Sequence, residues 1–409
     1  MKRREAIWRQ SSREISEAEL ARIIAGVNPL VAKVLEKALG SKDLNETEGE
    51  ILARVQGEEL EALVITANLL RKRAIGDTVT YIVNRNINFT NICSGNCGFC
   101  AFRVAPESPE ALLYSLEEIG RRAREAWERG ATEVCIQGGL HPDLNPNYYR
   151  DILLTVKESA PQIHIHAFSP MEITYGAEKA GMPVREYLTI LREAGLDSMP
   201  GTAAEILVPE VRKIIAPKKM GVEKWVEVIR SAHKLGIPTS STILYGHIEH
   251  PEHWVKHILL LRSIQQETGG FTELVPLGFV HPNTLLYREG LSRPGPLLEE
   301  HLKVHALSRL LLKGWINHVQ VSWVKMGPKV SQLCLKGGAD DFGGTLMEES
   351  ISRLAGAKQG ENMNPEMFRK LIWEIGRIPA QRSTTYAILN RFPLPSTPSA
   401  AECAFGKHA

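Results

Sequence analysis

From Thr78 onward the chain alternates short β-branched runs with amphipathic helical stretches, and this alternation limits the possible folds more than any other feature. The candidate strands are Thr78–Asn84, Glu133–Gln137, Gln162–Ala167, Asp197–Pro200, Thr239–Leu244, Glu273–Leu277, His318–Val321 and Asp340–Phe342. The helical stretches between them lie near residues 116–129, 147–159, 184–194, 221–235, 252–267, 299–313 and 328–335. Strands and helices that alternate in this way form parallel βαβ units with right-handed crossovers.

Eight such units are expected to close into an α/β fold, a (β/α)8 barrel of the TIM type, with residues 78–344 as its core. A doubly wound open sheet is the alternative, but no G-x-G-x-x-G follows the first candidate strand. The active sites of such barrels lie at the C-terminal ends of the strands. The polar residues that follow each candidate strand are therefore the candidates for function.

The segments outside the barrel are expected to be mainly helical. Residues 1–77 form an N-terminal helical segment, in which Asn45 begins a helix of the capping-box type. Residues 345–391 form a C-terminal helical segment, for which the sequence predicts a helix start at Thr345. The tail 392–409 is rich in Pro, Ser and Ala and is expected to be disordered.

The loop after the first candidate strand carries Cys93, Cys97 and Cys100 in the spacing C-x3-C-x2-C. Gly95 and Gly98 interrupt any helix in this loop, so that the three thiolates can converge on one small object. A structural zinc site needs four N or S ligands, and electron-carrying iron–sulfur clusters usually have four cysteines. A cubane on three thiolates leaves one iron open for chemistry. This pattern favours a catalytic cluster, with a zinc knuckle or a metal-free reactive loop as alternatives.

Polar side chains and glycines also follow the other candidate strands. Gly138 and Gly139 leave backbone groups open to a ligand, or else form a plain turn. His166 lies near the C-terminal end of its strand and is a candidate for substrate contact. Glu172 and Glu205 can hold a substrate amine or a ribose, or can take part in structural ion pairs.

Charge and composition indicate an ordinary globular enzyme. The chain has 49 basic and 47 acidic residues, a balance that gives no reason to expect nucleic acid or an anionic membrane as a partner. No apolar run is long enough to span a bilayer, and the charged start Met1–Glu5 lacks the apolar region of a signal peptide. Three clustered thiols suit a reducing compartment better than a disulfide framework. We therefore expect a cytoplasmic protein.

The cysteine loop resembles the signature of the radical S-adenosylmethionine (SAM) superfamily, C-x3-C-x-aromatic-C, with Phe99 as the aromatic residue. The resemblance implies a [4Fe-4S] cluster on the three cysteines, with SAM bound at the fourth iron. The glycine pair matches the stretch that contacts the methionine end of SAM, although Leu140 stands where a glutamate is commoner. The candidate SAM-binding residues are Phe99, Gln137, Gly138, Gly139, Ser169 and Glu172.

Longer stretches, spread over about residues 45–390, resemble the CofH branch of this superfamily. The stretch Pro200–Glu205 also separates this chain from the enzymes of the futalosine route to menaquinone, MqnE and MqnC. The corresponding stretch of those enzymes is closer to Gly-Gly-Gly-Ala-Glu. Ser383 and Thr385 depart slightly from the usual C-terminal pattern of the branch. The stretches that carry the resemblance are Asn84–Asn91, Gln137–Asp143, Ala167–Ile173, Pro200–Glu205, Tyr245–Glu249 and Gly343–Glu348.

The resemblance implies a radical SAM transferase of FO (deazaflavin) biosynthesis. A 5′-deoxyadenosyl radical from SAM would take a hydrogen atom from L-tyrosine, whose Cα–Cβ bond would then break. The 4-hydroxybenzyl group would add to C5 of 5-amino-6-(D-ribitylamino)uracil, called the aminouracil below. The other products would be 2-iminoacetate, 5′-deoxyadenosine and methionine. The candidate substrate-binding residues are His166, Thr202, Glu205 and His247, and the sequence assigns no catalytic side chain.

The same resemblance implies two protein partners. One is a separate CofG-type subunit that acts on the product, because this chain contains only one barrel. The other is a low-potential electron donor, a flavodoxin or a ferredoxin. A futalosine-pathway enzyme of the MqnE or MqnC type is the alternative within the superfamily. An iron–sulfur or zinc-binding protein without catalytic activity is the alternative of another class.

Overall fold

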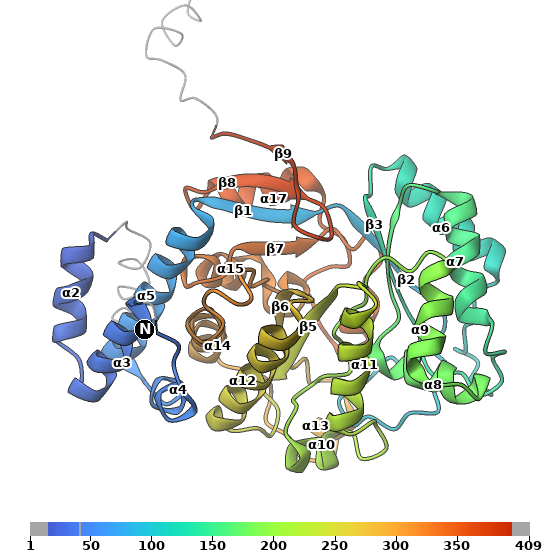
Figure 1. The fold of residues 1–409 in the computed structure, drawn as a ribbon, viewed down its shortest axis with the longest axis horizontal. Coiled ribbons are helices and arrows are strands. Elements are labelled where there is room, and N and C mark those ends of the chain that lie inside the picture. Colours follow the sequence, from blue (N-terminus) through green and yellow to red (C-terminus); the bar gives the residue numbers. More distant parts are fainter. Residues whose placement is uncertain (1–14, 41, 395–409) are drawn as a thin grey trace, which may run out of the picture.

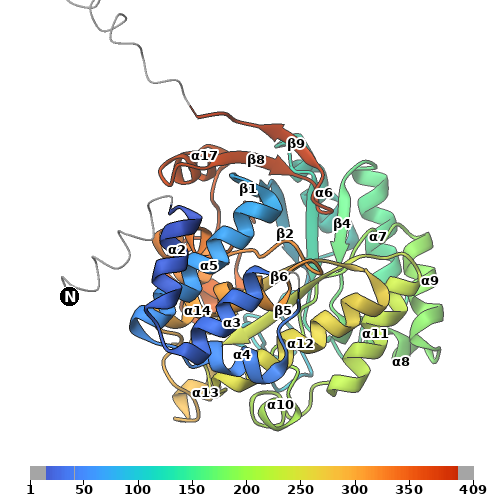
Figure 2. The ribbon, with the colours of Figure 1, turned by 60° about the vertical axis from the view of Figure 1, so that its left-hand side comes forward.

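The computed structural model describes residues 15–40 and 42–394. Parallel strands follow one another in chain order around a closed ring, with helices outside them (Figures 1 and 2). The ring closes because β1 (Thr78–Ile82) pairs in parallel with β7 (Asp341–Gly344) and runs directly into β2 (Asn84–Asn88). The remaining ring strands are β3 (Glu133–Gln137), β4 (His164–Ala167), β5 (Thr239–Tyr245) and β6 (Phe271–Gly278). This is the expected (β/α)8 barrel.

The predicted strands differ from the observed ones at three places. The predicted strand Thr78–Asn84 is divided, because β1 pairs with β7 while β2 pairs with β3. The fourth and seventh ring positions are reduced to isolated parallel bridges at Ser198 and Met199 and at Val319 and Gln320. These bridges still connect β4 to β5 and β6 to β7, so the ring remains complete.

The barrel helices end close to the predicted positions. Their starts follow local signals, as where the Ser115 side chain accepts a hydrogen bond from the Glu118 N–H. Three helices were not predicted: α8 (Pro170–Ala180), α10 (Pro209–Ile215) and α13 (Leu285–Arg288). The predicted helices are α6 (Leu116–Glu128), α7 (Tyr148–Ser159), α9 (Val184–Glu193), α11 (Val222–Lys234), α12 (Pro251–Thr268), α14 (Leu298–Leu311) and α15 (Trp323–Lys336).

The described part of the N-terminal segment is a helical layer on the side of the barrel. Asn45 and Glu48 form the expected capping box at the start of α4. The layer packs through α4 on α12 and through α5 on α14. No helix in residues 15–40 and 42–394 is both long and apolar enough to cross a membrane. The four helices are α2 (Glu17–Ala25), α3 (Pro29–Leu39), α4 (Glu46–Ala53) and α5 (Gly57–Ile75).

The C-terminal segment corrects two predictions. Thr345 begins no helix, because its hydroxyl donates to the Asn84 carbonyl and accepts from the Asn84 N–H. The segment contains α16 (Ile351–Ala355) and α17 (Pro365–Trp373), but also two strands. These strands are β8 (Ile378–Arg382), parallel to β1, and β9 (Ile388–Arg391), antiparallel to β8. Residues 395–409 lie outside the described residues, and they include Cys403 and most of the predicted tail.

The turn between β8 and β9 closes the barrel at the N-terminal ends of its strands. The Arg382 Nε lies 2.5 Å from the Asp341 Oδ2 at the start of β7, and its Nη2 lies 3.4 Å from the Glu273 Oε2 near the start of β6. The Tyr386 hydroxyl donates to the same Glu273 carboxylate and its ring stacks on His318. We call this group, Glu273, Asp341, Arg382 and Tyr386, the barrel floor.

We expect the barrel floor to depend on Arg382. An Arg382→Ala substitution leaves the buried Asp341 and Glu273 carboxylates without their cation, and breaking a buried ion pair costs about 3–5 kcal/mol. Urea unfolding of the variant measures this loss. Arg391→Ala, at an exposed position of the same hairpin, is the matched control and should leave the unfolding midpoint unchanged. Equal midpoints for both variants would contradict the role of Arg382.

Candidate active site

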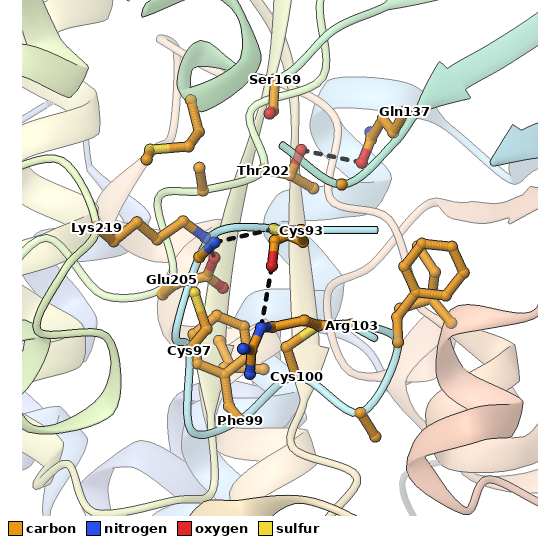
Figure 3. Close-up of a pocket in the computed structure, with 18 of the residues that line it drawn as sticks. Cys93, Cys97, Phe99, Cys100, Arg103, Gln137, Ser169, Thr202, Glu205 and Lys219 are labelled. Carbon is orange, nitrogen blue, oxygen red and sulfur yellow. Dashed lines mark hydrogen bonds and ion pairs between the residues drawn. The ribbon is translucent and has the colours of Figure 1, made fainter. Parts of the chain in front are cut away.

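The three thiols of the cysteine loop line one cavity with a volume of about 260 Å³. The cavity lies at the C-terminal ends of the strands, since Asn88 and Gln137, the last residues of β2 and β3, also line it. Figure 3 shows Cys93, Cys97 and Cys100 on the loop that encircles this space. All three are free cysteines, so each has a sulfur that can bind a metal.

Backbone hydrogen bonds hold the cysteine loop against three other segments. The Ser94 N–H donates to the Leu140 carbonyl at 2.9 Å, which joins the loop to the segment after β3. The Gly98 N–H donates to the Ile215 carbonyl at the end of α10, and its carbonyl accepts from the Leu286 N–H in α13. The loop is therefore held in place by segments far away in the sequence.

The surroundings of the thiols suit thiolate ligands once a metal centre is bound. Burial raises the pKa of the Cys97 thiol to about 11, and the Lys219 ammonium opposes that rise. Burial also raises the pKa of Cys100, against which backbone N–H groups of Phe102 and Arg103 act. The Gly95 N–H points to the Cys93 Sγ at 3.3 Å. Metal binding needs deprotonated thiols, and these donors and the ammonium stabilise that form.

No group of three His, Cys, Asp or Glu side chains within the described ranges is arranged around the position of a single metal ion. Each thiolate of a cubane binds a different iron, so the cysteines of such a site need not meet at one point. The residues present fit a cluster in this respect: three accessible sulfurs on one loop face one cavity.

Gly138 and Gly139 pack directly under the cysteine loop. A Cβ on Gly139 would lie 2.2 Å from the Ile92 carbonyl oxygen and 2.8 Å from the Cys93 Cβ. A Cβ on Gly138 would lie 2.5 Å from the Phe89 ring. The glycines are thus required for close approach of two loops, whereas the sequence suggested only an open backbone or a plain turn. Both glycines also line the cavity.

The Glu172 carboxylate binds the backbone of the glycine pair. Its Oε1 accepts from the Gly138 N–H at 2.9 Å, and its Oε2 accepts from the Ser169 N–H and hydroxyl, both at 2.7 Å. Ser169 and Glu172 form the capping box of α8. Burial raises the pKa of the Glu172 carboxyl to about 7, although these hydrogen bonds oppose the rise. Both residues line the cavity, but the carboxylate of Glu172 is already engaged by the protein.

We expect Glu172→Ala to weaken both the fold and the binding of SAM. The variant keeps the Ser169 N-cap but loses the Glu172 half of the α8 capping box and releases the Gly138 N–H, which costs about 1–3 kcal/mol of stability. The glycine pair then moves, and the KM for SAM should rise at least several-fold. Glu48→Ala removes an equivalent capping-box residue from α4 and should lower the melting temperature without changing that KM. A parallel rise of KM in both variants would argue against the role of Glu172.

An ion pair forms the opposite wall of the cavity. The Lys219 Nζ lies 2.5 Å from the Glu205 Oε1, and it lies over the Phe99 ring at 5.1 Å from the centroid. Thr202 donates to the Gln137 Oε1 at 3.4 Å (Figure 3). The predicted Phe99, Gln137, Thr202 and Glu205 are therefore brought together at one cavity. Lys219 was not predicted, because it lies in an unpatterned loop after α10.

Two predicted residues do not line this cavity. His247 is buried, with its Nε2 at the Leu244 carbonyl and its Nδ1 accepting from the Ile248 N–H, so the protein already uses both ring nitrogens. His166 lies lower in the barrel, on β4, where its Nδ1 is 2.7 Å from the Ser198 Oγ. Lys325 lines the cavity and was not predicted; its Nζ lies 3.1 Å from the Ser352 hydroxyl.

Two family profiles match the chain in succession. The radical SAM superfamily matches residues 87–261, and the CofH/MqnC C-terminal region matches residues 268–394. The 5-amino-6-(D-ribitylamino)uracil–L-tyrosine 4-hydroxyphenyl transferase of Methanothermobacter thermautotrophicus is 51% identical over 87% of this chain and 96% of its own length. The enzyme of the same name from Methanocaldococcus jannaschii is 52% identical over 79% of this chain and 91% of its own length.

A longer relative and a solved structure extend the comparison. The FO synthase of Mycobacterium tuberculosis is 50% identical over 84% of this chain, which spans only 40% of that protein. The crystal structure of methylornithine synthase (PylB) superposes with a TM-score of 0.67 at 19% identity, covering 85% of this chain and 97% of the other. At this identity the structure supports the fold alone.

Proposed function

The chain belongs to the radical SAM superfamily, in the family of the 5-amino-6-(D-ribitylamino)uracil–L-tyrosine 4-hydroxyphenyl transferases, and on that premise we propose that it transfers the 4-hydroxybenzyl group of L-tyrosine to C5 of the aminouracil in FO biosynthesis. The identity of 51% along 96% of the relative from M. thermautotrophicus carries this proposal. The cavity with three thiols and two glycines supports it, because these are the groups that the chemistry of the superfamily requires.

The residues that line the cavity have different roles in the proposed reaction. Cys93, Cys97 and Cys100 would hold a [4Fe-4S] cluster, and the backbone of Gly138 and Gly139 would face the methionine end of SAM. When bound, the cluster and SAM supply a 5′-deoxyadenosyl radical by reductive cleavage. The apolar lining of the cavity keeps water away from the reacting groups. Its apolar side chains include Leu244, Leu277 and Phe279.

Two protein partners complete the proposal. The chain spans 40% of the FO synthase of M. tuberculosis, and a CofG-type partner would act on the product. A low-potential donor, a flavodoxin or a ferredoxin, would reduce the cluster, because cleavage of SAM in this way consumes an electron.

A product assay tests the proposed function. The protein is reconstituted anaerobically with iron and sulfide, reduced with dithionite, and supplied with SAM, tyrosine and the aminouracil. We expect about four irons per chain, 5′-deoxyadenosine, and a tyrosine-derived adduct of the aminouracil by mass spectrometry. If tyrosine is not consumed while a futalosine precursor is, the chain catalyses the MqnE or MqnC reaction instead. Four irons without 5′-deoxyadenosine would contradict radical SAM chemistry altogether.

A further inference from the structure

Two short helices, α10 and α13, cover the side of the cysteine loop that faces away from the cavity. They meet at Gly98, which lies between Cys97 and Cys100 and forms backbone hydrogen bonds to Ile215 and Leu286. A Cβ on Gly98 would lie 3.4 Å from the Leu286 Cβ and 3.6 Å from the Ile215 oxygen, so both helices are in close contact with the loop. Neither Ile215 nor Leu286 lines the cavity. The outer surface of these helices is therefore separated from the cavity by little more than the cysteine loop.

The outer side chains of α10 and α13 include large apolar groups that are exposed to solvent. Ile214 in α10 is 54% exposed and Leu285 in α13 is 49% exposed, although their chain neighbours Ile215 and Leu286 are buried. Leu291, directly after α13, is 53% exposed. Single exposed apolar residues are ordinary, whereas a group of them on one surface marks an interaction site.

The same surface carries more basic than acidic side chains. The exposed basic residues of the segments 93–103, 209–219, 285–291 and 351–358 are Arg103, Lys213, Lys218, Arg288, Arg353 and Lys358. The exposed acidic residues of these segments are Glu210 and Glu289. Within residues 15–40 and 42–394, Arg353 is the one of the six that forms an ion pair, with Glu361. The chain as a whole has 49 basic and 47 acidic residues, so this excess of positive charge is local.

The segment 351–358 adjoins this surface through α13. The Asn283 N–H donates to the Ala355 carbonyl, and its side-chain amide donates to the Leu354 carbonyl. Arg288 follows Leu285 by three residues and so lies on the same side of α13. We call Lys213, Ile214, Leu285 and Arg288 the loop face, which combines two apolar and two basic side chains.

The proposed reaction needs one electron from outside the protein for each SAM that is cleaved. The carrier is oxidised by one electron, and this electron is consumed as the C5′–S bond of SAM breaks into methionine and the 5′-deoxyadenosyl radical. The rate of electron transfer falls steeply with distance, so the carrier must dock close to the cysteine loop. SAM and the substrates occupy the cavity during turnover, which leaves the outer side of the loop for the carrier.

We propose that the loop face is the docking surface for an acidic, low-potential one-electron carrier protein. Carboxylates of the carrier would face Lys213 and Arg288, and its apolar contacts would cover Ile214 and Leu285. Electron-transfer complexes bury less than about 1,200 Å² in total, so a small surface of mixed character is sufficient. The basic side chains would mainly raise the rate of association. This inference rests on the proposed function for the electron and adds the place at which it enters.

Cleavage of SAM with two different reductants tests the docking surface. The reconstituted enzyme receives SAM and either dithionite or a purified acidic flavodoxin that has been reduced enzymatically. Lys213→Glu and Arg288→Glu should each raise the flavodoxin concentration for half-maximal formation of 5′-deoxyadenosine at least about tenfold. The rate with dithionite should stay within about twofold of the wild type, because a small reductant needs no docking surface.

Two variants with the same changes of charge at the other end of the molecule are the matched controls. Lys370 is exposed on α17 and Arg391 is exposed on β9, whereas α10 and α13 lie at the opposite end (Figures 1 and 2). Lys370→Glu and Arg391→Glu should leave both rates within about twofold of the wild type. Equal responses of the loop-face variants and the controls to flavodoxin would overturn the assignment. A parallel loss of the rate with dithionite would also overturn it, because the loop face would then support the cysteine loop itself.

Cross-linking gives a second measurement that does not depend on activity. A carbodiimide joins a carboxylate to a lysine amine in direct contact, and we expect Lys213 or Lys218 in the peptides that link the reconstituted enzyme to flavodoxin. The yield should fall in high salt, because screening weakens contacts between exposed charges. Cross-links confined to other lysines would overturn the assignment. So would a dimer of this chain that Leu285→Ser dissociates without changing the response to flavodoxin.

The docking surface and the proposed function fail in different ways. An enzyme that cleaves SAM but makes no adduct of the aminouracil would contradict the proposed substrates, while the comparison of the two reductants would still decide the docking surface. An enzyme that makes the adduct and whose Lys213→Glu and Arg288→Glu variants respond normally to flavodoxin would contradict the docking surface alone.

Discussion

Replacing Cys93, Cys97 or Cys100 by alanine should abolish both the visible absorption of the reconstituted cluster and the cleavage of SAM. All three sulfurs line the same cavity, and the described residues bring no other thiol to it. A cubane that loses one of three protein ligands has two irons without a protein ligand and should not be retained. The measurements are iron content, visible absorption and 5′-deoxyadenosine after reduction with dithionite.

Cys334→Ala is the matched control for these variants. Cys334 is buried in α15 and does not line the cavity, so its replacement creates only a small internal void. Its variant should lose about 1 kcal/mol of stability and keep its iron content and SAM cleavage. A cluster that survives in any of the three loop variants would show that the ligands have been chosen wrongly. Loss of the cluster from Cys334→Ala would have the same meaning.

Gly139→Ala should be almost as damaging, although it removes no ligand. The added methyl would lie 2.2 Å from the Ile92 carbonyl oxygen. This oxygen belongs to the backbone, so it cannot avoid the clash by a change of rotamer, as a flexible side chain could. The cysteine loop must then move, and with it Cys93, whose Cβ would lie 2.8 Å from the new methyl. We expect a loss of about 1–3 kcal/mol in stability and at least about a tenfold loss in SAM cleavage per chain.

Substitutions at two other glycines serve as comparisons for Gly139→Ala. Gly221 precedes α11, and a Cβ there would meet nothing within 4 Å, so Gly221→Ala should behave as the wild type. Gly138→Ala meets the Phe89 ring rather than backbone, and the ring can shift, so its effect should be intermediate. Wild-type SAM cleavage by Gly139→Ala would mean that the contact between the two loops is not needed for activity. Circular dichroism and iron content distinguish loss of the fold from displacement of the loop.

The positions of most barrel helices and of the ring strands other than the first, fourth and seventh followed from local patterns. Alternation predicted Glu133–Gln137 at its observed bounds, because β-branched and apolar residues at period two define such a strand wherever it packs. The Asn45 cap was predicted for a similar reason, since a cap involves atoms only three residues apart. The hairpin of β8 and β9 was missed because Pro379 marks its run as a poor strand, and its pairing with β1 joins residues far apart in the sequence.

The sequence by itself determined the barrel, the cysteine loop and most of the predicted residues that line the cavity at the C-terminal ends of the strands. Only the tertiary structure decided what these residues do there. Glu172 proved to hold Gly138, and His247 proved to be engaged by the backbone, because both depend on contacts made after the strands have come together. The placement of Lys219 beside Cys97 likewise depends on a loop whose path has no periodic signal. The sequence placed His166 near the C-terminal end of its strand, but only the pairing with the next segment brought its Nδ1 to 2.7 Å from the Ser198 hydroxyl.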